Sequence, residues 1–63
     1  MKHLIENFEF EIYVEQLEDG YVGCYSCPCG YRHCSTHIES KETAIITAKG
    51  QAHAHYQTEH KDK

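Results

Sequence analysis

The chain has few residues from which a hydrophobic core could be built. Its 63 residues include no Trp, one Met, two Phe and one Pro, and its mean hydropathy is −0.70. A chain of about 60 residues buries only about 60% of its surface on folding, and one below about 70–80 residues usually needs a disulfide, a metal or a partner for stability. We therefore expect one small domain over residues 1–63, without the enclosed pocket of an enzyme.

Long hydrophobic runs are also absent. No stretch of 18 apolar residues is available to form a membrane-spanning helix. The N-terminal sequence MKHLIENFEF lacks the continuous apolar segment and the cleavage site of a signal peptide. We therefore expect a cytoplasmic protein with no membrane partner. In a reducing compartment, clustered cysteines favour metal binding over disulfides.

Negative charge is concentrated in the first third of the chain. The formal net charge is −4, with −5 in residues 1–20 and +1 in residues 21–63. Nucleic-acid binders usually carry a basic stripe that neutralises phosphates, and an acidic segment does not supply one. The glutamates are therefore interpreted either as the solvated face of a strand or as an acidic surface for a basic partner.

Hydrophobic periodicity predicts three antiparallel strands followed by one helix, which is an α+β fold. Apolar and polar residues alternate over residues 8–15, and Asp19-Gly20 favours a hairpin to a second strand at 21–26. A third strand is expected at 31–37. Ser40 is a candidate N-cap for a helix over 41–60, with an inward face made of Ile45, Ala48, Ala52, His55 and Tyr56. Gly50 is expected to allow close packing on the sheet or to break the helix.

Four Cys and six His are the most distinctive residues of the chain. Zinc prefers four thiolate or imidazole ligands in a tetrahedron. Cys27 and Cys29 flank a tight turn at Pro28, and His55 and His60 lie near the helix end at a spacing that zinc sites use. We therefore predict one structural zinc bound by these four residues, with other tetrahedral metals such as iron as the alternative.

The remaining cysteines and histidines have several interpretations. Cys24 and Cys34 are expected to lie opposite each other on the second and third strands. They are interpreted as a pair of small buried side chains, as a cross-strand disulfide or as additional metal ligands. His53 projects from another side of the helix than His55 and is expected at the surface. His33 is expected to be exposed, although it is also an additional candidate ligand.

These residues resemble the two-cysteine, two-histidine zinc fingers. The likeness covers residues 21–60, with Tyr25-Ser-Cys27-Pro-Cys29-Gly30 as the knuckle and Ala52-His-Ala-His55-Tyr-Gln-Thr-Glu-His60 as the helix end. The chain is most similar to short single-finger proteins of viruses of bacteria and archaea and of some prokaryotic genomes. The resemblance implies a zinc-stabilised ββα finger, here extended by an acidic strand over residues 1–20. In DNA-reading members the helix start enters the major groove, but residues 39–43 here lack the Arg, Asn or Gln that reads base edges.

Two functions follow as hypotheses. The first is a non-enzymatic zinc module that binds a protein through the rim of its first strand, formed by Glu9, Glu11, Tyr13 and Glu15. The alternative is a small nucleic-acid-binding transcriptional regulator whose contacts would include Arg32, Lys41 and Lys49. A redox role for Cys24-x2-Cys27 is disfavoured because reactive pairs of this kind lie at a helix N-terminus. An exposed edge of the first or third strand would also permit a homodimer.

Overall fold

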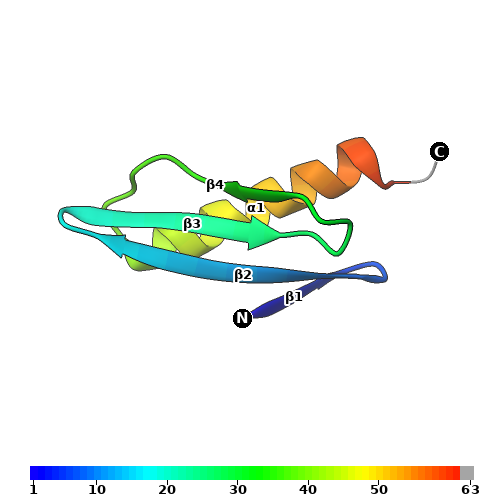
Figure 1. Cartoon of the computed structure of the whole chain (residues 1–63), viewed down its shortest axis with the longest axis horizontal. Helices are drawn as coiled ribbons and strands as arrows, with labels where there is room; N and C mark the ends of the chain where they lie inside the picture. The colour runs from blue at the N-terminus through cyan, green and yellow to red at the C-terminus, as the bar shows by residue number, and fades with distance from the viewer. Residues whose placement is uncertain (62–63) are drawn as a thin grey trace.

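A sheet covered on one face by a single helix forms the fold, as seen in a computed structural model that describes residues 1–61 (Figure 1). The strands are β1 (Lys2–Ile5), β2 (Phe8–Leu17), β3 (Gly20–Ser26) and β4 (Arg32–Cys34). They form one antiparallel sheet in the order β1-β2-β3-β4, and the helix α1 (Lys41–Glu59) follows. The predicted α+β class, with an antiparallel sheet before a C-terminal helix, is confirmed. The last two residues of the predicted domain, 62 and 63, lie outside the described residues.

The central hairpin forms where the alternation of apolar residues predicts it. Phe10 and Ile12 of β2 are almost fully buried, and the intervening Glu9 and Glu11 are not. The register runs from Leu17 opposite Gly20 to Glu11 opposite Ser26, so β2 turns into β3 at residues 18–19. This hairpin is the longest pairing in the sheet.

The sheet has four strands, so the prediction of three was one strand short. β1 pairs with β2 through a two-residue turn, Glu6-Asn7. Glu6 adopts a positive φ of 55°, a conformation that usually requires Gly, and no Gly in the sequence marks the turn. β1 pairs with residues 8–11 of β2, so it covers the first part of this edge and leaves residues 13–17 of β2 without a strand on that side. β1 and β4 are the outer strands of the sheet.

β4 is shorter than the strand predicted at 31–37. After Cys34 the regular pairing ends, and the chain then contacts β3 through hydrogen bonds between Ser35 and Gly23 and through an isolated bridge between Tyr21 and Ile38. His37, the last residue of the predicted strand, lies beside the β2–β3 turn with its Nε2 2.8 Å from the carbonyl oxygen of Asp19. The segment after β4 therefore packs against the end of the molecule that contains the β2–β3 turn.

Small residues bring the helix close to the sheet. Ser40 is the N-cap and accepts a hydrogen bond from the backbone N–H of Thr43, as predicted. The buried helix face consists of Ala44, Ala48, Ala52 and Tyr56. Gly23 of β3 lies directly against the backbone of Ala44, so a Cβ at this position would overlap the Ala44 carbonyl group.

The prediction for Gly50 was wrong in both of its forms. The helix continues through it, and a Cβ built there meets nothing within 4 Å. No helix within residues 1–61 has the length and hydropathy needed to cross a bilayer.

The core extends from the sheet to the end of the helix. Ile5, Phe10 and Ile12 pack with Tyr25 and with Ala48, Ala52 and Tyr56 of α1, and Phe8 and Ile45 join this cluster from its margin. Cys27 belongs to the same buried cluster. The apolar core therefore reaches the first of the predicted metal ligands and fixes its position.

Candidate metal centre

The four predicted ligands come together at one end of the molecule. The turn between β3 and β4 lies beside the C-terminal end of α1 (Figure 1). There one side-chain ligand atom from each of Cys27, Cys29, His55 and His60 lies within 4.8 Å of all the others. The two pairs are 26 residues or more apart in sequence, so the site joins the sheet to the helix.

The distances within the cluster match a tetrahedral ligand set. The Nε2 atoms of His55 and His60 are 3.2 Å apart, Cys27 Sγ is 3.5 Å from His60 Nε2, and Cys29 Sγ is 3.6 Å from His55 Nε2. A zinc ion with ordinary bond lengths to sulfur and nitrogen would set about 3.3 Å between two nitrogens and about 3.6 Å between sulfur and nitrogen. The residues therefore fit a single tetrahedral metal ion.

The cysteine pair is held by a tight turn. The backbone N–H of Cys27 donates to the carbonyl oxygen of Tyr31, and the N–H of Gly30 donates to the carbonyl oxygen of Cys27. Gly30 has a φ of 104°, which side-chain-bearing residues rarely adopt, so Gly is required to close the turn. As a result both thiols face the helix end, with Cys27 buried and Cys29 exposed.

The histidine pair depends on where the helix ends. His55 is within α1, whereas His60 is the C-cap, with φ −125° and ψ −16°. The N–H groups of His60 and Lys61 both donate to the carbonyl oxygen of Tyr56. This departure from helical geometry brings two histidines five residues apart to the same point, as the sequence predicted.

Burial favours the neutral forms of two of these residues when no metal is bound. It raises the pKa of the Cys27 thiol, which a hydrogen bond from the Cys29 backbone N–H partly offsets. It also lowers the pKa of His55, helped by repulsion from His60 and opposed by the nearby carboxylate of Glu59. A neutral imidazole is ready to bind a cation, whereas the thiol must release its proton to the metal.

Aromatic rings hold the two imidazoles in place. Tyr31 stacks on His55 with ring centroids 4.7 Å apart and planes within 6°. Phe8 packs against His60 at 4.5 Å. Sequence reasoning missed both rings, because the contact partners come from distant strands and turns and no local spacing marks them.

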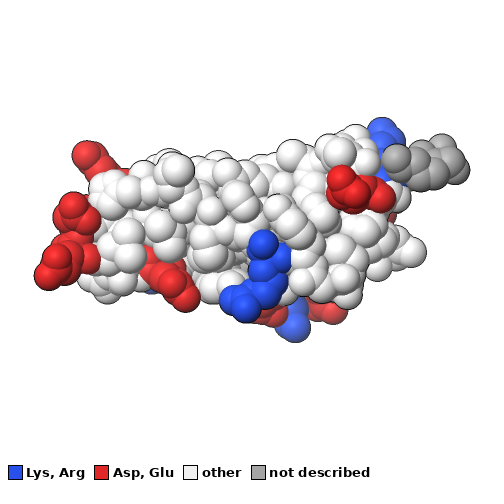
Figure 2. Space-filling model, turned by 45° about the horizontal axis from the view of Figure 1, so that its top comes forward, with Lys and Arg blue, Asp and Glu red and all other residues white. Residues whose placement is uncertain are grey.

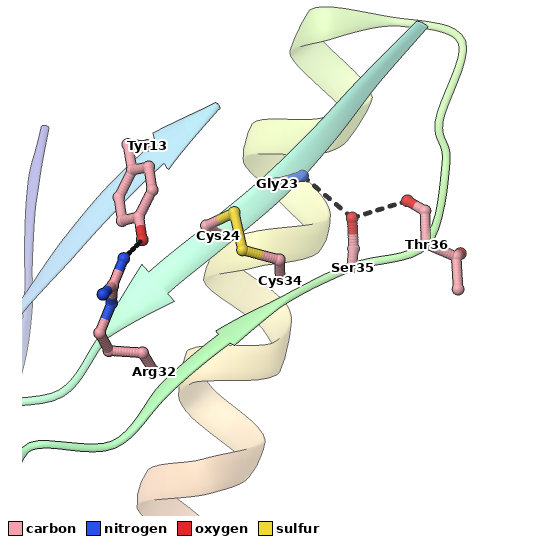
Figure 3. Close-up of a disulfide and its surroundings, with 7 residues drawn as sticks. All are labelled: Tyr13, Gly23, Cys24, Arg32, Cys34, Ser35 and Thr36. Carbon is pink, nitrogen blue, oxygen red and sulfur yellow. Dashed lines mark hydrogen bonds between the residues drawn. A yellow bond between two sulfur atoms is a disulfide. The ribbon is translucent and has the colours of Figure 1, made fainter. Parts of the chain in front are cut away.

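The second cysteine pair forms a disulfide away from the metal cluster. Cys24 and Cys34 are opposite each other in the β3–β4 register and are bonded through their sulfurs (Figure 3). Of the three interpretations of this pair, the structure has the cross-strand disulfide. Beside it the guanidinium of Arg32 donates to the Tyr13 hydroxyl at 2.7 Å. The Ser35 hydroxyl accepts from the Gly23 backbone N–H at 2.9 Å.

The other candidate residues lie on different elements. Lys41 is at the first position of α1, Lys49 is in its middle, and Arg32 is on β4. His53 is exposed, as expected, and lies near His3 of β1 with ring centroids 6.3 Å apart. His33 is exposed on β4 and is not part of the four-residue cluster.

Comparisons of the chain with protein-family models, with curated proteins and with solved structures found no match. The evidence for a Cys2His2 cluster in this small fold of one sheet and one helix is therefore the geometry of the structure alone.

Proposed function

We propose that this chain is a non-enzymatic zinc module, related in its site to the two-cysteine, two-histidine zinc fingers, that binds a basic protein partner. The observation that supports zinc is the match between three separations of the ligand atoms and those expected in a tetrahedron. Two thiolates and two imidazoles suit zinc best among common metals. Four protein ligands leave no open position for an activated water, so a structural role is favoured over catalysis.

An acidic surface supports the proposal of a protein partner, but this surface is not the strand rim that was expected from the sequence. Glu11 is engaged by the N-terminal amine at 3.1 Å and by Lys2 at 3.3 Å, and the Tyr13 hydroxyl is bonded to Arg32. The rim of β2 therefore offers less free negative charge than its sequence indicates.

Acidic residues gather instead at the hairpin end of the molecule. The contacts of Asp19 with His37 and of Tyr21 with Ile38 bring the segment before α1 next to the β2–β3 turn. Figure 2 shows negative side chains at this end, on the left of the view. We call this surface the acidic end, and it comprises Glu18, Asp19, Glu39 and Glu42. It complements a surface rich in Lys and Arg.

Charge reversal at the acidic end tests this proposal. The metal-loaded protein is titrated with a labelled peptide of ten alternating lysines and serines, and binding is followed by fluorescence anisotropy. We expect the double variant Glu18→Lys/Glu42→Lys to bind at least tenfold more weakly than the wild type. The matched control Glu9→Lys/Glu15→Lys, which reverses the same charge on β2, is expected to lose less than threefold. Equal losses in both variants would contradict docking at the acidic end.

The nucleic-acid alternative is tested by the same approach. Glu39 and Glu42 flank the helix start, where they would repel phosphates, and Arg32 is already hydrogen-bonded to Tyr13. We therefore expect no retention of a random DNA duplex at 50 mM salt. Retention that is lost in the variant Lys41→Ala/Lys49→Ala would favour the regulator hypothesis instead.

A further inference from the structure

One edge of β2 has no partner strand over its second half. β1 pairs with residues 8–11, and the pairing on this side ends where the N–H of Ile12 donates to the carbonyl oxygen of Met1. Figure 1 shows β1 beside the right-hand part of β2 and ending near its middle. Residues 13–17 then continue toward the β2–β3 turn without a strand of residues 1–61 on this side. We call this stretch the open edge of β2.

The backbone groups of Val14 and Gln16 point to the open edge. The N–H and carbonyl groups of successive strand residues face alternate neighbours. Since the N–H of Ile12 faces β1, the backbone groups of residues two and four positions further along β2 face the same side. Those residues are Val14 and Gln16.

The pairing of β3 leads independently to the same assignment. Val14 lies opposite Gly23 in the register. Gln16 lies opposite Tyr21. The backbone N–H and carbonyl groups of Tyr21 bond to Ile38, and those of Gly23 bond to the residue after β4, on the side of β3 away from β2. Two N–H and two carbonyl groups of β2 therefore face the open edge instead of β3.

The open edge lacks the usual protection of a free strand. Natural sheets protect such edges with proline, lysine, bulges or very short strands. Residues 13–17 read Tyr-Val-Glu-Gln-Leu, without Pro, Gly or Lys. The charge of Glu15 is partly balanced within the molecule, because the hydrogen bond to Tyr13 and then the Glu15 carboxylate raise the pKa of the Arg32 guanidinium. The open edge is therefore suited to pair with another strand.

The charge at the end of this stretch indicates which strand it accepts. Leu17 is followed directly by Glu18 and Asp19, so the open edge leads into the acidic end. A second copy of the chain is itself acidic, with a net charge of −4. Pairing of two copies centred on Glu15 would place this carboxylate opposite its own counterpart, which is destabilising. A segment with basic residues at one end fits the open edge better.

We propose that the basic protein partner binds as an extended segment that adds a strand to the open edge of β2, an inference that rests on the proposed function and names the conformation of its partner. Antiparallel pairing is the more stable kind, and each pair in this sheet is antiparallel. The added strand therefore runs opposite to β2, and its N-terminal end lies beside Glu18 and Asp19. In this binding mode main-chain hydrogen bonds supply affinity, and the basic residues before the extended segment set its direction.

Hydrogen exchange of the metal-loaded protein, followed by NMR, tests the pairing. The probe is a peptide of three lysines followed by six alternating valines and threonines. The amides of Val14 and Gln16 should exchange rapidly in the free protein and at least tenfold more slowly at saturating peptide. The amides of Tyr13 and Glu15 face β3 by the same alternation, so they are internal controls and should change less than threefold. Unchanged exchange of Val14 and Gln16 at saturation would overturn the proposal.

A reversed peptide tests the direction of the added strand. It carries the same residues with the three lysines after the alternating segment, so its charge and composition are unchanged. We expect it to bind at least fivefold more weakly, because its lysines would lie away from the acidic end. Equal affinities of the two peptides would overturn the antiparallel arrangement.

Chemical shifts in the same titration distinguish failure of this inference from failure of the proposed function. If the peptide shifts Glu18 and Glu42 while the exchange of Val14 and Gln16 stays unchanged, strand addition fails and the proposed function stands. If the peptide shifts no residue, the proposed function fails and strand addition fails with it. If Val14 and Gln16 exchange more slowly as the protein concentration rises without peptide, a second copy covers the open edge and the proposal is overturned.

Discussion

At the scale of single residues, the imidazole of His55 contacts other members of the Cys2His2 cluster and also an aromatic ring beside it. Its Nε2 faces Cys29 Sγ and His60 Nε2, and its ring stacks on Tyr31. His53 is two residues away on the same helix, is exposed and is not part of the cluster. These two histidines therefore form a matched pair with the same chemistry and different positions.

We expect His55→Ala to weaken zinc binding at least 100-fold, because the tetrahedron loses one of its four ligands. His53→Ala should change the dissociation constant less than twofold. Competition with a chromogenic zinc chelator measures both constants. Similar losses in the two variants would contradict the assignment of the ligands.

Metal binding should also weaken steeply as the pH falls. Two thiols and two imidazoles must be free of protons before they can bind, so protons compete with the metal. Because the pKa of Cys27 is raised and that of His55 is lowered, protons compete with the metal at this thiol before they compete at this imidazole as the pH falls. The dissociation constant should therefore rise as the pH falls, by about 100-fold per pH unit where binding of the metal displaces two protons.

Chelator competition between pH 8 and pH 5.5 provides the measurement. A dissociation constant that changes less than tenfold over this range would contradict a site with two thiolates. The same pH series with the His53→Ala variant serves as the control, because this exposed histidine should not affect the slope.

At the scale of elements, replacing either of two glycines by alanine should change the stability of the protein, but in opposite directions. Gly23 of β3 lies against the backbone of Ala44, so a methyl group there would force the helix away from the sheet. Gly50 lies in the exposed interior of α1 with open space around it. We expect Gly23→Ala to destabilise the protein by about 1–3 kcal/mol through overpacking. Gly50→Ala should stabilise it by about 0.5–1 kcal/mol through helix propensity.

Urea denaturation of the metal-loaded variants measures both effects. If Gly23→Ala left the midpoint unchanged, the close approach of β3 and α1 would be refuted. The same Gly→Ala change is expected to lower the stability at one position and to raise it at the other. Each variant is therefore a control for the other.

The disulfide is a second link between elements, and its two cysteines are not members of the four-residue cluster. Cys24 and Cys34 are ten residues apart in sequence and join β3 to the three-residue strand β4. In the chain-entropy description, closing a loop of this length stabilises the fold by about 2–3 kcal/mol. We expect reduction with a phosphine to lower the unfolding free energy by about this amount while the zinc stays bound.

Mass spectrometry checks the extent of reduction, which adds two hydrogens to the chain. The variant Cys24→Ala/Cys34→Ala should match the reduced protein in stability and in zinc content. Loss of zinc on reduction would show instead that the metal and the disulfide are not independent.

The elements differ in how well the sequence predicted them, and the reason lies in local signals. The β2–β3 hairpin and α1 were predictable because alternation, Asp19-Gly20 and the Ser40 cap act within a few residues. β1 was missed because its turn places Glu6 in a conformation that Glu rarely adopts. The four clustered residues were predictable from turn and helix-end spacings. The sequence also predicted that Cys24 lies opposite Cys34, but it left open whether the two sulfurs are bonded, because a cross-strand position suits a pair of free thiols and a disulfide alike.

At the scale of the whole molecule, the chain is elongated, with extents of 41 × 18 × 18 Å. Its core is thin, and Phe10, Ile12 and Cys24 are the largest fully buried side chains. The Cys24–Cys34 disulfide ties β3 to β4, and the Cys2His2 cluster ties the β3–β4 turn to the end of α1. A metal ion at this cluster would link residues at least 26 positions apart in sequence and would hold the C-terminal part of the helix on the sheet.

Native mass spectrometry of the purified chain, before and after chelation and with circular dichroism alongside, tests this central claim most directly. We predict one zinc ion per chain, a polypeptide mass two hydrogens below the reduced value, and loss of most helical signal when the metal is removed. A chain that stays folded without metal, or one that is four hydrogens lighter with Cys27 and Cys29 oxidised, would contradict a fold held together by zinc.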